Sequence, residues 1–98
     1  MTPETLALIT AYFVCSATAE ERVLTQTEAT TCATLYLETK LSFMPNFDLS
    51  TYRALSTKER AKVNMQAYAA YLAWRAANPK LVADLEAEAR AQVAESTS

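Results

Sequence analysis

Apolar side chains recur every three or four residues along most of the chain, which is the spacing that places them on one face of an α-helix. Thr2, Pro3 and Glu4 suit a helix start, because the threonine can accept from a free backbone N–H and proline fits the first helical position. We expect a helix from there to Glu21 or Arg22. Its predicted buried face is wide and comprises Leu6, Ile9, Phe13 and Ala17, with Leu8, Tyr12 and Cys15 on the adjoining strip.

A second helix is predicted to begin near Gln26. Thr25 and Glu28 have the spacing of a capping box, in which the two side chains satisfy each other's free backbone donors. The expected core positions are Ala29, Cys32, Ala33, Tyr36, Leu37 and Leu41. The many threonines of this stretch are poor helix formers, so either tertiary packing overrides them or they line a contact surface.

Residues 43–48 break the helical pattern, because Pro45 cannot continue a helix and Asn46 favours a turn. Asp48 can cap a short helix that runs to Leu55. The loop also contains Phe43, Met44 and Phe47. We expect these side chains to fold back over the core as a lid, and the alternative is an exposed binding patch.

The clearest periodicity begins after a second capping box, Ser56 to Glu59. One seam consists of Val63, Ala67, Ala70, Trp74, Ala77 and Leu81. A second strip lies beside it, with Tyr71 between the two, and comprises Ala61, Met65, Tyr68, Leu72 and Ala76. We therefore expect this helix to be central and contacted on two sides.

Asn78 and Pro79 are predicted to end that helix and to begin another, with Asn78 as its cap. The last helix has an apolar side made of Leu81, Val82, Leu85, Ala89 and Val93. We expect Glu86 and Arg90 to pair at i,i+4, and residues 95–98 to fray. Since glycine is absent, Asn46 and Asn78 are the expected left-handed positions.

The predicted fold class is all-α, and residues 1–98 form a single domain because the chain is too short for two. Short connections favour antiparallel neighbours, hence a compact four-helix bundle or an irregular helical domain. The first two helices are expected to form an antiparallel hairpin.

The complete absence of glycine and histidine excludes several kinds of chemistry. Glycine-rich phosphate loops are ruled out, and so are histidine-dependent triads and the common zinc sites. Carboxylate catalysis remains formally open, because the chain has eleven Asp and Glu residues. We expect no enzyme activity, no catalytic or metal-binding residues and no cofactor.

The two cysteines, Cys15 and Cys32, are 17 residues apart, and the point midway between them falls at the predicted link between the first two helices. In an antiparallel hairpin they would face each other about two turns from the link, so a disulfide is plausible. Such a bond would suit an exported or periplasmic protein. The start of the sequence lacks a basic secretory leader, which favours reduced thiols in the cytoplasm.

Charge is unevenly distributed along the chain, although the formal net charge is only −2. Residues 1–48 carry a net −4, residues 49–83 a net +5 and residues 84–98 a net −3. Neighbouring acids could neutralise the basic stretch, or it could be a docking face. We do not expect nucleic acid as a partner, because the pI is near 5.1 and the sequence has no nucleic-acid-binding module.

We therefore expect a small non-enzymatic helical protein that binds another protein by surface occlusion, as an adaptor, inhibitor or immunity-type factor does. The partner should have an acidic surface, and no membrane is involved. The predicted contact residues are Phe43, Phe47, Arg53, Lys58, Arg60, Lys62, Tyr68, Tyr71 and Arg75. A homodimer through the seam from Val63 to Leu81 is a variant. The alternative is a bundle with an apolar ligand cavity lined by Trp74, Tyr12, Tyr36, Phe13 and Met65.

Overall fold

The structure, a computed structural model, describes the backbone of residues 1–97 and the side chains of residues 1–96. It consists of α1 (Pro3–Glu21), α2 (Gln26–Leu41), α3 (Leu49–Arg53), α4 (Thr57–Ala77) and α5 (Pro79–Thr97). The described residues form no strand, so the predicted all-α class is confirmed.

Local capping chemistry sets where the helices begin. Thr2 accepts from the backbone of Thr5 at 3.1 Å, and Asp48 accepts from that of Thr51 at 2.7 Å. Both predicted capping boxes, Thr25 with Glu28 and Ser56 with Glu59, are complete. The predicted starts of α1, α2, α3 and α4 are therefore confirmed.

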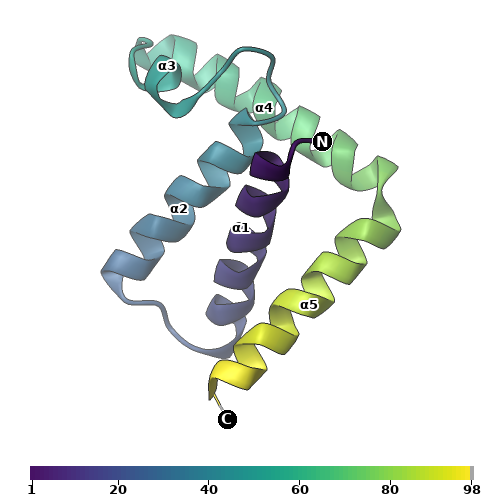
Figure 1. Ribbon diagram of the computed structural model, residues 1–98. Helices are drawn as coiled ribbons and strands as arrows, with labels where there is room; N and C mark the ends of the chain where they lie inside the picture. The colour runs from purple at the N-terminus through teal and green to yellow at the C-terminus, as the bar shows by residue number, and fades with distance from the viewer. Residues whose placement is uncertain (98) are drawn as a thin grey trace.

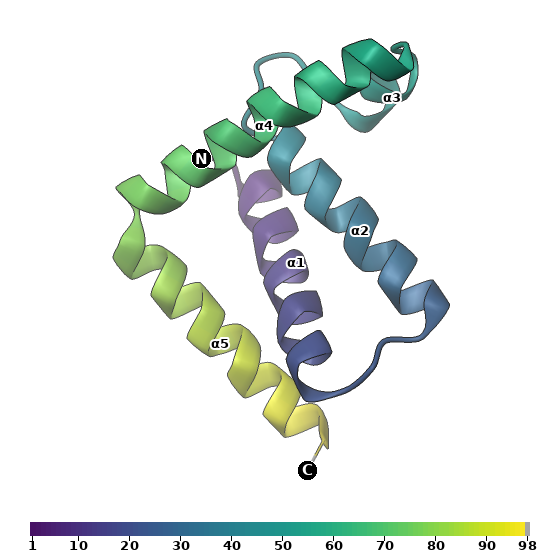
Figure 2. The same ribbon diagram turned by 180° about the vertical axis from the view of Figure 1, so that it is seen from behind.

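Helix α1 lies between α2 and α5, and α4 crosses the end of this layer where α1 begins (Figures 1 and 2). Helices α1 and α2 form the predicted antiparallel hairpin. Helix α5 runs in the same direction as α1, so the last two helices are not antiparallel neighbours. Of the two predicted arrangements, the molecule adopts the irregular helical domain.

Asn78 forms the corner between α4 and α5. Its side-chain amide donates to the Trp74 carbonyl at 2.9 Å and so caps the end of α4, while its own carbonyl accepts from Val82 at 3.0 Å. Its φ of −131° is not left-handed, so that prediction is wrong. Asn46, with φ 61°, is left-handed as predicted.

The main core joins α1 to α5 through six buried side chains: Ile9, Phe13, Ala17, Val82, Ala89 and Val93. This stripe explains why α5 packs on α1, since both helices present their small and branched apolar residues there. The predicted core positions Leu6 and Leu81 are instead exposed at 39% and 38%, and both lie in the first turn of their helices.

An aromatic cluster attaches α4 to the layer. The rings of Tyr12 and Tyr36 are stacked with centroids 4.8 Å apart, and Tyr36 meets the edge of Tyr71 at 6.1 Å. Phe43 packs against Trp74 at 5.4 Å and closes the cluster from the loop. The lid interpretation of Phe43 is therefore correct.

Helix α2 contributes a buried cation to its contact with α4. Lys40 is 7% exposed, its Nζ donates to Asn64 Oδ1 at 2.6 Å, and it lies 4.2 Å from the centre of the Tyr36 ring. Burial lowers the pKa of Lys40, because an ammonium group removed from water without a carboxylate partner is destabilised.

The molecule is a thin, open layer. Its extents are 44 × 32 × 19 Å and its radius of gyration is 14.2 Å, against about 13 Å for a compact domain of this length. Its accessible surface is 6378 Å², whereas a folded monomer of this mass exposes about 5,500 Å². Much apolar surface that a closed bundle would bury is left uncovered.

Three further core predictions are wrong for this reason. On α2, Ala29 and Ala33 are exposed, because within the layer the first half of that helix has α1 on one side and no helix on the other. The whole second strip of α4, from Ala61 to Ala76, is also exposed, since α5 turns away from α4 at Asn78 instead of covering it.

Helix α5 continues to Thr97, and Ser98 lies outside the described residues, so the predicted fraying of residues 95–98 stays a prediction. The predicted pair of Glu86 with Arg90 does not form. Each of these residues instead pairs with another helix, as described below.

Cys15 and Cys32 are joined by a disulfide, with their Cα atoms 5.7 Å apart. This bond ties the exposed first half of α2 to the middle of α1. The reduced pair that the sequence favoured is therefore not the state of the structure.

Candidate interaction surface

The predicted contact residues do not form one surface. Tyr71 is only 4% exposed and belongs to the aromatic cluster, and Phe43 packs against it. Arg75 donates to the Tyr71 hydroxyl at 3.2 Å and lies 3.7 Å from Glu86. Phe47 is half-buried beside Leu8 and Leu41. Tyr71, Phe43 and Arg75 are therefore removed from the candidate site, because their contacts are internal.

The basic residues divide into two groups. Arg75 and Lys80 are paired with acids of α5, which agrees with the intramolecular interpretation. Arg53, Lys58, Arg60 and Lys62 form no ion pair with any described residue. For this second group the expected neutralisation by an ion pair within the chain is wrong, because no acidic side chain among the described residues is close enough to pair with them.

The outward side of α4 brings basic and apolar residues together. Positions 58, 62, 65, 69, 72 and 76 are separated by alternating steps of four and three, so they share one face of the helix. We call this surface the α4 face, and it comprises Lys58, Lys62, Met65, Ala69, Leu72 and Ala76, with Ala61 and Tyr68 on its flank.

The α4 face contains the most exposed group of large apolar side chains on any helix of the described chain. Met65 is 74% exposed, Tyr68 45% and Leu72 43%. The alanines between them leave room for the backbone of another helix to approach closely. A contiguous exposed apolar strip on a folded protein is typical of an interaction site.

Lys58 occupies an electrostatically unfavourable position. It lies in the first turn of α4, where the positive end of the helix dipole repels a cation. Glu59 is engaged in the capping box with Ser56, whose hydrogen bonds hold the pKa of the Glu59 carboxyl below its usual value.

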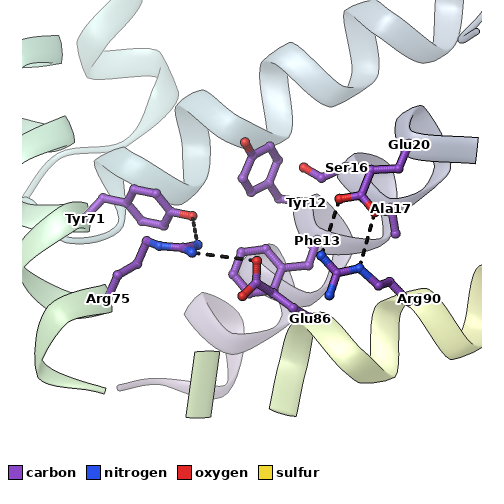
Figure 3. Close-up of a pocket in the computed structure, with 9 residues that line it drawn as sticks. All are labelled: Tyr12, Phe13, Ser16, Ala17, Glu20, Tyr71, Arg75, Glu86 and Arg90. Carbon is purple, nitrogen blue, oxygen red and sulfur yellow. Dashed lines mark hydrogen bonds and ion pairs between the residues drawn. The ribbon is translucent and has the colours of Figure 1, made fainter. Parts of the chain in front are cut away.

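A small polar pocket lies at the junction of α1, α4 and α5 (Figure 3). Arg90 reaches Glu20 of α1 at 3.3 Å, and Arg75 lies beside Glu86. The volume is about 160 Å³, well below the 300–1,000 Å³ typical of ligand sites. Each carboxylate in the pocket has a guanidinium partner, so these groups act as interhelical ion pairs.

The residues predicted to line an apolar cavity are engaged with one another or exposed. Tyr12 stacks on Tyr36, and Trp74 packs on Phe43. Met65 points to solvent. No group of three or more potential ligands that could hold a metal ion occurs among the described residues.

In comparison with known proteins, no family model, curated protein or solved structure matches the chain. No helix within the described part of the chain is long and apolar enough to cross a membrane.

Met65 and Leu72 belong to the second strip of α4, which was predicted to be in contact with the rest of the fold but is exposed. Met65 and Leu72 share one face of the helix with Lys58 and Lys62. This pattern favours exposure of the face, because lysine is rarely buried. Tyr71 lies four residues after Ala67 on the inner side of α4, and both side chains are buried.

Proposed function

We propose that this chain is a small non-enzymatic protein that binds another protein through the α4 face. The partner presents an acidic surface, and binding occludes it, as in an adaptor, inhibitor or immunity-type factor. The observation that carries this proposal is the exposed strip of Met65, Tyr68 and Leu72, which continues directly into the unpaired Lys58 and Lys62.

The composition of the α4 face supports a protein partner. Methionine and aromatic residues are enriched in the centres of protein interfaces, and charged residues are placed at their rims. Here the apolar residues occupy the middle of the helix and the lysines its first two turns. Such charges increase the association rate and select the partner more than they increase affinity.

The disulfide supports an exported location over the cytoplasmic one. Disulfides persist in oxidising compartments and are rare where thiols are kept reduced. Titration of thiols in denatured protein purified from its host tests this point. We expect no free thiol, and two free thiols would favour the cytoplasm.

Photo-crosslinking in the native host tests the binding proposal. A photoreactive amino acid at Ala69, in the middle of the α4 face, is compared with one at Ala87, an exposed alanine of α5. We expect a discrete adduct from position 69 alone, lost when Lys58→Glu and Lys62→Glu are added. No adduct, or the same adduct from both positions, would contradict the proposal.

A further inference from the structure

Helix α4 forms one edge of the molecule, and its inner side packs on the rest. In both views α1, α2 and α5 lie on the same side of α4 (Figures 1 and 2). Ala67 and Tyr71 are buried on that side, where Tyr71 meets Tyr36 of α2. The α4 face points the other way, so the outer half of α4 is a convex ridge. From Lys58 to Ala76 the ridge is about 27 Å long, at 1.5 Å per residue.

The ridge has a crest and two flanks. Met65 and Leu72 are seven residues apart, which is about two turns, so they follow each other along the crest. Gln66 and Tyr68 are two residues apart and therefore about 160° apart around the helix by the shorter path, which crosses the crest. They lie on opposite flanks, and all four side chains are exposed. A partner that reaches around the ridge can contact both flanks.

We infer that α4 enters an apolar groove of its partner, with walls that contact both flanks of the ridge. This inference rests on the proposed function and names the shape and chemistry of the partner surface. Apolar anchors at i, i+3 and i+7 are the pattern of a helix that binds in a groove, and Met65, Tyr68 and Leu72 have this spacing. Since α4 is already a capped, packed helix, binding does not have to order it.

The charges of α4 place carboxylates at one end of this groove. Lys58 and Lys62 lie in the first two turns, and no charged residue occurs from Val63 to Trp74. The matching groove is therefore acidic where it receives the start of α4 and neutral along the rest. A helix that lies on a lipid surface is rich in Lys and Arg along its polar face. Between Lys62 and Arg75 this helix has none, which favours a protein groove over a membrane.

A second copy of the α4 face does not have the chemistry that this site requires. In an antiparallel pairing that aligns the two apolar strips, Lys62 of one copy would lie against Leu72 of the other. A parallel pairing would place each lysine against its own copy. Neither arrangement gives the lysines a carboxylate on the opposing face, and a second convex ridge has no walls to contact the flanks.

Photo-crosslinking from the two flanks of the full chain in its native host tests the groove. A short photoreactive amino acid replaces Gln66 or Tyr68, and the adducts are compared with that from position 69. We expect the same partner from both flanks. An adduct at 69 with none from one or both flanks overturns the groove and leaves the proposed function standing. No adduct at 69 contradicts the proposed function, and the groove with it.

A steric variant gives a second measurement on the crosslinked partner. Gln66→Trp enlarges one flank, so a groove wall should obstruct it and weaken binding about 10-fold or more in titration calorimetry. The matched control, Ala87→Trp at an exposed position of α5, should bind as the wild type does. Circular dichroism melts verify that both variants fold. Unchanged or tighter binding of Gln66→Trp would overturn the inference, because a flat partner surface leaves that flank free.

Discussion

Reduction of the Cys15–Cys32 disulfide should cost a large part of the chain's stability. The bond closes a loop of 17 residues, which in the chain-entropy treatment removes about 10 cal/mol/K from the unfolded state, or about 3 kcal/mol at 25 °C. Total stabilities of small domains are about 5–15 kcal/mol. For a chain of this size each kcal/mol shifts Tm by about 4–8 °C, so reduction should lower Tm by about 12–24 °C.

The structure locates this effect in the first half of α2. Exposed residues there include Thr27, Ala29, Thr30, Thr31 and Ala33, and the helix becomes buried only at Thr39, Lys40 and Leu41. Few contacts other than the disulfide therefore hold residues 26–34 to α1. On reduction their backbone amides should exchange with solvent faster than those of α4.

Circular dichroism melts with and without a phosphine reductant, together with hydrogen exchange, measure both effects. The Cys15→Ser, Cys32→Ser double variant is the control, since its Tm should already be low and should not respond to reductant. An oxidised wild type whose Tm is unchanged on reduction would refute the reasoning. Packing, and not the crosslink, would then hold the two helices together.

Three further predictions concern charged groups. Lys58→Glu should stabilise the fold by about 0.3–1 kcal/mol in urea titrations, because it replaces a cation with an anion in the first turn of α4; destabilisation would show that Lys58 makes a contact the structure lacks. Hydrogen bonds from Arg22 and from the Thr25 backbone hold the pKa of Glu28 at about 2, against 4.5 when unfolded. Its contribution is therefore present above pH 4.5 and lost as the pH falls toward 2, and Glu28→Gln, which preserves the capping box, should abolish this part of the acid sensitivity. Burial lowers the pKa of Lys40 below 10.5, so the folded state releases that proton first and the wild type should gain stability relative to Lys40→Met as the pH rises to 10.5. Urea titrations of both pairs across these pH ranges check the two signs, and parallel curves for variant and wild type would contradict them.

Local signals in the sequence predicted the helix starts well, and long-range arrangement much less well. The capping boxes at Thr25 and Ser56 involve residues three apart, so they operate whatever the rest of the chain does. Which helix α5 packs against depends on the corner at Asn78, where the chain turns so that α5 lies against α1. An apolar strip on α4 predicts an apolar face but does not say which element covers it.

The same limit explains the errors at the candidate site. Glu86 and Arg90 are correctly spaced for a pair within α5, yet each is closer to a partner on another helix. Lys40 gave no sign of burial, because lysine is usually exposed and its contacts with Asn64 and Tyr36 depend on how α2 meets α4. The basic start of α4 was identified from sequence, because Lys58, Arg60 and Lys62 lie within five consecutive residues.

The affinity of the protein that crosslinks to position 69, measured by titration calorimetry, tests the role of the α4 face most directly. Three forms of the chain are compared: the wild type, Met65→Asp with Leu72→Asp, and the control Ala87→Asp with Ala91→Asp on the exposed side of α5. Loss of two buried apolar anchors should weaken binding by roughly 100-fold or more, while the control binds as the wild type does. Equal affinity for all three forms would contradict the assignment of the α4 face.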